Sequence, residues 1–310
     1  MNKEFLYTFT VFTPTYNRAH LLPRLFESLR SQSFIDFEWI IIDDGSEDET
    51  SETVQAFNSR GSFPILYQYQ PHQHKKVAHN LALKLARGKL FLPVDSDDEL
   101  LPTALEILSQ NWNEIPEDQQ ALYAGVTGLR IDESNKIIGT KFPLNKMDST
   151  SLDMFYCYKI KGDKCGFIRT DILLEFPFPE NIPNHVPEGV VFSKIARFYK
   201  TRYINEPLLK AYKNANQITN YKYQLRLLQE NADGHAYWAR EILTNELDYF
   251  RQRPFWFFKI AANYTRFHLH MKMKGSLNKY PIQSKQAKGL VLAMLPIATI
   301  RFLLDYRRKN

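Results

Sequence analysis

The chain has 310 residues, of which 44% are hydrophobic and 24% are charged, a composition that excludes a disordered protein and is typical of a globular one. The formal net charge of +6 is uneven, because residues 251–310 contain 13 Lys and Arg against one acidic residue, which makes this tail +12 and the first 250 residues −6. A mildly acidic body argues against nucleic-acid binding, and two cysteines without an N-terminal signal-peptide core predict a cytoplasmic protein without disulfides.

Short apolar runs alternate with amphipathic helical patterns through the first hundred residues. Strands are predicted at Phe9–Phe12, Phe37–Ile42, Ile65–Tyr69 and Leu90–Val94. Helices are predicted to begin near His20, at Ser46 and at Lys76. Ser46 and Glu49 have the spacing of a capping box, in which each side chain bonds the backbone of the other. This alternation of strands and helices predicts an α/β fold with a doubly wound, mostly parallel sheet.

Polar clusters follow three of the predicted strands, at residues 13–18, 43–46 and 95–98. Ligands of open parallel sheets bind beyond the carboxyl ends of the strands, so we expect one shared site. Asp95, Asp97 and Asp98 would repel one another unless a cation held them, which favours Mg²⁺ or Mn²⁺. The alternative is a polar loop in which Asp98 or Glu99 starts the next helix.

The pattern is less regular after residue 102. A hairpin is predicted from Tyr123–Ile131 and Lys136–Gly139, with its turn at residues 132–135. A helix over Val190–Tyr199 and a strand over Arg202–Leu209 follow. These elements complete a predicted first domain over residues 1–215.

Four segments resemble, in order and spacing, the nucleotide-sugar half of family 2 glycosyltransferases with the GT-A fold. They are Phe12–Arg18, Ile41–Ser46, Val77–Asn80 with Ala86–Gly88, and Val94–Asp98. The chain is similar to this family over residues 5–210, and Gly162–Lys164 and Pro187–Gly189 look like a bacterial subgroup that builds capsule, exopolysaccharide or lipopolysaccharide. The resemblance implies an inverting hexosyl- or N-acetylhexosaminyltransferase that uses a nucleoside-diphosphate sugar.

The resemblance also implies roles for single residues. The residues assigned to the donor are Thr13, Pro14, Tyr16, Arg18, Asp43, Asp44, Lys76, Asn80, Asp95 and Ser96. Asp43 would bond the base, with the N3–H of uracil as the favoured partner, and Asp44 would support that loop. Asp97 would ligate the Mg²⁺ or Mn²⁺ that stabilises the leaving diphosphate, so it counts as a catalytic and metal residue. UDP is favoured, while GDP and dTDP stay open.

The position of the general base departs from the family pattern. Many relatives have a Glu-Asp pair before the helix that corresponds to Val190–Tyr199, whereas this chain has Glu188-Gly189. We favour Glu188 as the catalytic base that deprotonates the acceptor, with Asp163 as the alternative. The altered pair also leaves a non-catalytic sugar-nucleotide-binding protein as an alternative function.

Three other kinds of site are disfavoured. His72, His74 and His79 do not have the spacing of a zinc finger or a metalloprotease, and no Cys or Glu completes a ligand set. No G-x-G-x-x-G follows the first strand, which argues against a dinucleotide cofactor. Residues 13–18 lack glycine, which argues against a nucleotidyltransferase that would cradle a triphosphate.

Residues 216–310 are predicted to form a helical, basic and aromatic extension. Its apolar stretch, Gly289–Leu304, has sixteen residues, short of the roughly 20 that cross a bilayer, so an interfacial helix fits better. Attachment through residues 251–310 would place the chain at the inner face of the cell membrane, beside a glycan or lipid-linked acceptor. The alternative is that these helices pack on the catalytic domain or on a second copy of the chain in a homodimer.

Overall fold

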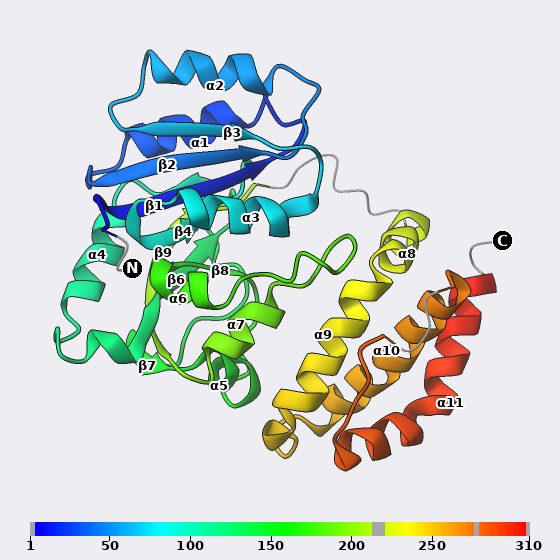
Figure 1. Ribbon diagram of the computed structural model, residues 1–310. Helices are drawn as coiled ribbons and strands as arrows, with labels where there is room; N and C mark the ends of the chain where they lie inside the picture. Colours follow the sequence, from blue (N-terminus) through cyan, green and yellow to red (C-terminus); the bar gives the residue numbers. More distant parts are fainter. Residues whose placement is uncertain (1–3, 213–220, 276–278, 308–310) are drawn as a thin grey trace. The chain divides into compact units, whose positions relative to one another are not determined.

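A computed structural model describes residues 4–212, 221–275 and 279–307 (Figure 1). The chain forms two compact units. The first contains Met1–Phe178 and Val191–Asn214, and the second contains Pro179–Val190 and Ala215–Asn310. The second unit therefore includes a short segment from the middle of the sequence, which the sequence did not predict. The predicted boundary at residue 215 falls within 213–220, outside the described residues.

The first unit is built on one mixed sheet. Its strands are β1 (Tyr7–Thr15), β2 (Phe37–Asp43), β3 (Ile65–Tyr69), β4 (Gly88–Pro93), β5 (Glu99–Leu100), β6 (Tyr123–Ile131), β7 (Lys146–Ser149), β8 (Lys164–Arg169) and β9 (Lys200–Lys210). They lie in the order β3-β2-β1-β4-β8-β6-β9-β5, and β7 also pairs with β9. The first four strands of this order are parallel, as the sequence predicted.

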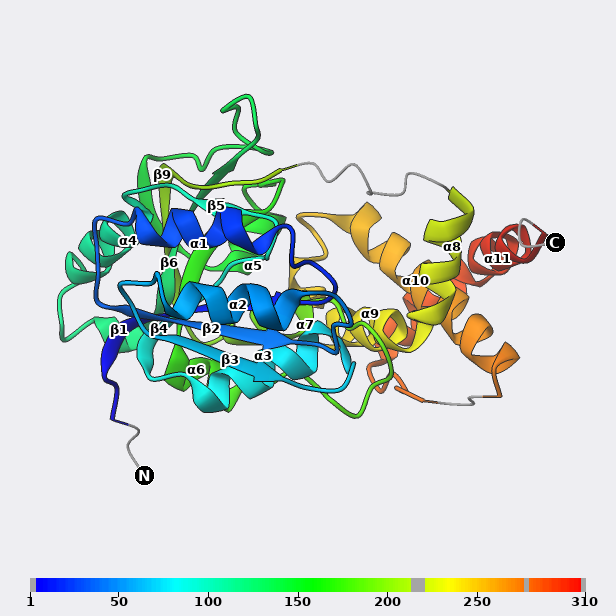
Figure 2. The ribbon, with the colours of Figure 1, turned by 90° about the horizontal axis from the view of Figure 1, so that it is seen from above.

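The central strands of this parallel half, β1 and β2, are mostly buried, because helices cover both faces of the sheet. Val11 packs in a core with α1 (Leu22–Arg30) and α2 (Thr50–Asn58), whereas the next residue, Phe12, packs on the opposite face with α3 (His74–Leu85). Figure 1 shows helices on both sides of the sheet, and Figure 2 shows α1 and α2 beside each other. This arrangement leaves the ends of the strands to form a site.

The second half of the sheet is more irregular than predicted. Strand β8 is antiparallel to both of its neighbours, β4 and β6, and β6 is parallel to β9 with register shifts. The predicted hairpin is reduced to a single bridge between Ile131 and Ile137, and Asn135 closes its turn with a left-handed φ of 60°. One bridge cannot hold a second strand, so Lys136–Gly139 forms none.

Helices complete the first unit. The remaining ones are α4 (Ala104–Asn113), a 3₁₀ turn (Gln120–Leu122), α5 (Ser151–Tyr156), α6 (Thr170–Glu175) and α7 (Gly189–Ile195), whose first two residues belong to the second unit. Helix α7 is shorter than predicted. The predicted capping box is wrong, because α2 begins at Thr50 and the Ser46 hydroxyl accepts a hydrogen bond from the Asn17 N–H instead.

The second unit is helical. Its elements are α8 (Tyr221–Glu230), α9 (Ala232–Asn245), a 3₁₀ turn (Leu247–Tyr249), α10 (Pro254–Met273) and α11 (Lys285–Arg307). Helix α11 has 23 residues and extends beyond the apolar stretch Gly289–Leu304 at both ends. By length and composition alone it could cross a membrane, and it is the one such helix in the described part of the chain.

Candidate active site

Three loops meet at the carboxyl edge of the parallel strands. Strand β1 lies between β2 and β4 and is parallel to both. The register pairs Thr15 with Asp43 on one side and Phe12 with Pro93 on the other. The loops that follow the three strands therefore begin at the same end of the sheet, as the sequence predicted.

The loop after β1 links the other two. The Asn17 N–H donates to the Ser46 hydroxyl at 2.9 Å, and the Asn17 side chain accepts from the Glu47 N–H at 2.8 Å. In the other direction, the Arg18 guanidinium donates to the Ser96 hydroxyl at 3.3 Å and lies 3.4 Å from a carboxylate oxygen of Asp97. The clusters after β1, β2 and β4 therefore form one hydrogen-bonded site.

Asp43 is buried at the end of β2. One carboxylate oxygen accepts from the Ser46 N–H at 2.8 Å, and the other accepts from the Tyr67 hydroxyl at 2.6 Å. Burial, with the hydrogen bond to Asp43, raises the pKa of Tyr67, so this hydroxyl stays a donor. Each oxygen keeps lone-pair capacity for a further donor, such as a base N–H.

Asp44 holds the loop that connects β3 to α3. One of its oxygens accepts from the Gln70 side chain at 2.7 Å and from the Gln73 N–H at 2.8 Å. The other accepts from the His74 N–H at 2.9 Å. His74 has a left-handed φ of 69°, which these bonds stabilise.

Two aromatic side chains flank this loop at the surface. The Tyr16 ring is 46% exposed, and its centroid lies 4.6 Å from that of His72. Pro14 is half-buried, whereas Thr13 is fully buried and its hydroxyl accepts from the Trp39 indole N–H at 2.9 Å. Thr13 therefore points into the core, and its predicted contact with the donor does not agree with this geometry.

A lysine that was not among the predicted site residues contacts the acidic loop. Lys75 donates to Asp95 at 2.8 Å, whereas Lys76 is only 6% exposed. Asn80 is also buried, and it exchanges two hydrogen bonds with the backbone of Phe178, at 2.9 and 3.0 Å. Asn80 thus anchors the chain where it leaves the first unit. The sequence could not separate two adjacent lysines at the start of a helix.

The remaining acidic residues are held by cations. Although burial opposes it, Lys75 keeps the pKa of Asp95 below its usual value. Asp98 is ion-paired with Arg130 on β6, a residue that the sequence did not indicate. Burial raises the pKa of Asp98 to about 7, although Arg130 lowers it. Asp98 and Glu99 do not start a helix, since Glu99 lies in β5.

The donor set fits a divalent cation only together with a substrate. Within the described ranges, no group of three or more His, Cys, Asp or Glu side chains could hold a metal. Asp97 is partly exposed, and Asp95 is two residues away. Mg²⁺ commonly takes one or two carboxylates and completes its shell with phosphate and water oxygens, which suits this pair.

Glu188 belongs to the second unit and is exposed. Its segment is fixed to the end of α8 and the start of α9. Asn184 donates to the Glu230 carbonyl at 2.8 Å, and the His185 N–H donates to the Asn231 side chain at 3.2 Å. Gly234 lies against the His185 carbonyl so closely that a Cβ would be 2.0 Å from that oxygen. The alternative base, Asp163, is exposed beside a turn in the first unit.

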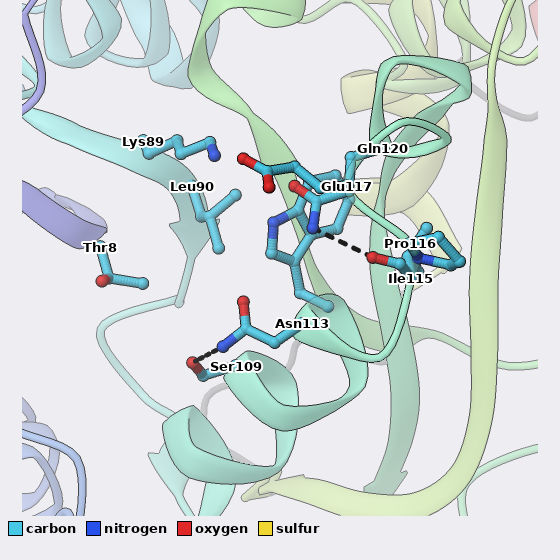
Figure 3. A pocket seen from close by; sticks show the side chains of 10 residues that line it. Thr8, Lys89, Leu90, Ser109, Asn113, Ile115, Pro116, Glu117 and Gln120 are labelled. Carbon is cyan, nitrogen blue, oxygen red and sulfur yellow. Dashed lines mark hydrogen bonds between the residues drawn. The ribbon is translucent and has the colours of Figure 1, made fainter.

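A separate pocket of about 420 Å³ lies between β4 and α4 (Figure 3). Thr8 and Lys89, near the starts of β1 and β4, lie on one side of it, and Asn113 and Gln120 lie on the other. It is therefore at the amino ends of the strands, opposite to the loops described above.

The family model described as glycosyl transferase family 2 matches residues 10–170, about half of the chain. These residues contain most of β1, all of β2 to β8 and all three loops of the site. The match therefore covers every predicted site residue except Glu188.

Three similar proteins are informative. The GalNAc(5)-diNAcBac-PP-undecaprenol beta-1,3-glucosyltransferase of Campylobacter jejuni is 28% identical over 72% of this chain and 74% of its own. Staphylococcus aureus TarS, a poly(ribitol-phosphate) beta-N-acetylglucosaminyltransferase, is 27% identical over 68% of this chain and 33% of its own. Its fragment solved with UDP-GlcNAc superposes with a TM-score of 0.58 and 18% identity, over 97% of this chain and 89% of the fragment. The structure of a Pyrobaculum calidifontis mannosyltransferase with GDP-Man and Mn²⁺ superposes with a TM-score of 0.55 and 15% identity, over 97% of this chain and 88% of its own.

Proposed function

The chain is a glycosyltransferase that belongs to glycosyl transferase family 2 and has the GT-A fold, and from this premise we propose that it moves a sugar from UDP to a glycan or lipid-linked acceptor with inversion. The observation that carries the proposal is the linkage of three strand-end loops into one site through Asn17 and Arg18. A nucleoside diphosphate has two recognisable ends, a base and a charged pyrophosphate, and the site offers a different set of side chains for each.

The base end of the donor would lie near Asp43. This carboxylate accepts hydrogen bonds and has no donor of its own when ionised, which suits an N–H such as N3–H of uracil. The exposed Tyr16 ring offers a surface on which a base can stack. The complex of TarS with UDP-GlcNAc supports UDP, and comparing the thermal shifts given by UDP, GDP and dTDP tests it.

The pyrophosphate end would lie near Arg18 and Lys75, whose cationic groups already contact Asp97 and Asp95. When Mg²⁺ or Mn²⁺ is bound, Asp97 would hold it with help from Asp95, and the cation would offset the charge that develops on the leaving diphosphate. The mannosyltransferase crystallised with GDP-Man and Mn²⁺ supports a divalent cation in this fold.

Glu188 would act as the general base. Its carboxylate takes the proton of the acceptor hydroxyl while the acceptor oxygen bonds to the anomeric carbon. The bond from that carbon to the diphosphate oxygen breaks, and its electron pair leaves with the nucleoside diphosphate. Attack from the side opposite to the leaving group inverts the anomeric configuration.

The acceptor class follows from the C. jejuni relative, whose name describes an undecaprenol-diphosphate-linked glycan. A lipid-linked acceptor would place the reaction at the cytoplasmic face of the cell membrane, with the chain held there peripherally through residues 251–310. Synthesis of a bacterial surface polysaccharide is the process that such a reaction would serve.

The substitution Glu188→Gln tests the proposal, with Glu180→Gln in the same segment as its matched control. We expect Glu188→Gln to abolish transfer while UDP-sugar still raises the melting temperature, because donor binding does not need the base. Glu180→Gln should keep full activity. Normal turnover of Glu188→Gln, together with loss of turnover in Asp163→Asn, would assign the base to Asp163 instead.

A further inference from the structure

Helix α11 exposes an unusual number of large apolar side chains. Leu292, Ile300 and Leu303 are 69%, 58% and 51% exposed. Seven large apolar residues of this helix are exposed: Leu292, Leu295, Ile297, Ile300, Leu303, Leu304 and Tyr306. Nineteen exposed large apolar residues occur in the whole described chain, so α11 holds more than a third of them in 23 residues. Such a patch marks an interaction surface.

One side of α11 is already occupied. Ala287, Ala298 and Asp305 are its buried residues, and the helix packs on α10 within the second unit. Asp305 accepts from Arg266 at 2.5 and 2.7 Å and from His270 at 3.0 Å, and both partners lie on α10. The C-terminal end of α11 is therefore fixed against α10.

The opposite side carries a continuous apolar stripe. Leu292, Pro296, Ile300 and Leu303 recur at intervals of four, four and three residues, the spacing of one helix face. All four are exposed. The stripe spans eleven residue steps, about 17 Å at 1.5 Å per residue. No described segment of the second unit covers these four residues.

Cations lie at both ends of the stripe. At about 100° per residue, Lys285 precedes it and Arg307 follows it on the same face, Lys288 lies beside that face, and all three are exposed. Asp305, the one acidic residue among residues 251–310, is buried and bonded to Arg266 and His270, so it does not offset the charge of the exposed cations. An apolar stripe bordered by positive charge is complementary to an anionic lipid surface, which combines acyl chains with negative headgroups.

We propose that the outer face of α11 docks the protein on an anionic bilayer, with the helix lying in the interface. This inference rests on one part of the proposed function, the peripheral membrane location, and names the surface that would provide it. Crossing the bilayer would carry Arg301 and the bonded group of Arg266, His270 and Asp305 toward the hydrocarbon, which costs several kcal/mol for each charge. Pairing with a second copy would bring the cations of two α11 helices together, which like-charge repulsion opposes.

The test measures flotation of the full chain with vesicles of phosphatidylcholine, alone or mixed with phosphatidylglycerol. We expect the protein to bind the anionic vesicles and not the neutral ones, and its binding to weaken as the salt concentration is raised. The double substitution Ile300→Glu/Leu303→Glu should reduce binding at least tenfold. The matched control is Ile35→Glu, since Ile35 is 82% exposed in the first unit, and it should bind like the unaltered chain.

Other outcomes would overturn the proposal. Equal binding of the double variant and the unaltered chain would exclude the α11 face. A dimer that the double variant loses, seen by light scattering without vesicle binding, would assign the face to a second copy. If the protein stayed in the native membrane fraction after carbonate extraction, α11 would be a membrane-spanning helix. Donor hydrolysis is measured in parallel, because it is independent of vesicle binding and separates failure of this proposal from failure of the proposed function.

Discussion

Lys75 and Lys76 occupy adjacent positions on α3 but have different surroundings. Lys75 is 40% exposed and contacts Asp95, while Lys76 is buried. We predict that Lys75→Met raises the donor KM about tenfold, the effect of one charge-assisted hydrogen bond, and leaves the melting temperature unchanged. Steady-state kinetics with a UDP-sugar would measure this.

The control for this substitution is Lys84→Met, an exposed position at the other end of α3. It should leave KM unchanged. If Lys76→Met raised KM while Lys75→Met did not, Lys76 and not Lys75 would be the lysine that binds the donor.

His79 is a buried polar residue without a polar partner. Its ring lies among those of Phe12, Phe91 and Phe178, and neither nitrogen has a hydrogen bond. Burial, with a smaller effect of Lys75, lowers its pKa to about 3. The folded protein therefore excludes a proton that the unfolded chain binds below pH 6.5, so stability is complete above pH 6.5 and falls as pH drops toward 3.

We predict that His79 costs the folded state about 2 kcal/mol between pH 6.5 and 5, at about 1.4 kcal/mol per pH unit. His79→Leu should remove this part of the pH dependence, as measured by urea unfolding at several pH values. His20→Leu, at an exposed position, should not change it. A parallel pH profile for His79→Leu and the unaltered chain would contradict the assignment.

The outline of the site could be predicted at the level of residues, but side-chain direction could not. Asp43, Asp95 and Asp97 follow predicted strands, and parallel pairing alone places them together. Thr13 lies in the same motif, yet it points into the core because alternate residues of a strand face opposite sides. Lys75 and Lys76 differ by one helical step of 100°, and no signal in the sequence indicates which one contacts Asp95.

At the scale of elements, the segment 179–190 is the feature that local patterns could not reveal. Its partners lie at the junction of α8 and α9, about fifty residues further along the chain, in contacts such as that between His185 and Asn231. The capping-box prediction failed for the same reason, because Ser46 bonds Asn17 across the site rather than its own helix. Long-range contacts decided both cases.

This segment gives a prediction at the level of elements. A Cβ on Gly234 would meet the His185 carbonyl at 2.0 Å, so Gly234→Ala must shift the segment that carries Glu188. If Glu188 is the base, kcat should fall about 10²-fold, since small displacements of a catalytic group have effects of that size. The donor KM should not change, because the donor residues belong to the first unit.

Gly289→Ala is the matched control, because a Cβ at Gly289 would meet nothing within 4 Å. It should keep normal kinetics. A parallel loss of kcat and donor binding in Gly234→Ala would indicate general destabilisation instead, and unchanged kcat would mean that the segment does not position the base.

At the scale of the whole molecule, the binding of the cation, the binding of the nucleotide and the stability of the fold should depend on one another. The site residues for the donor come from three loops of one sheet, so a ligand that contacts all of them stabilises the first unit by mass action. At a hundred times its Kd, a nucleotide would add about 2.7 kcal/mol. Since Asp95 and Asp97 can hold a cation only with phosphate oxygens to complete its shell, neither Mn²⁺ nor nucleotide alone should give the full effect.

We therefore predict that UDP and Mn²⁺ together raise the melting temperature more than the sum of their separate shifts, and that EDTA reverses the excess. If Asp43, which Ser46 and Tyr67 hold in place, accepts the N3–H of uracil as proposed, UDP should give a larger shift than GDP. Thymine carries the same N3–H, so a smaller shift with dTDP would come from its methyl group or its deoxyribose. Asp97→Asn should abolish the excess over additivity, whereas Asp118→Asn, at an exposed position outside the site, should preserve it. Additive melting-temperature shifts in the unaltered chain would mean that the cation and the nucleotide bind independently, at separate sites. A larger shift with GDP than with UDP would make a GDP-sugar the donor.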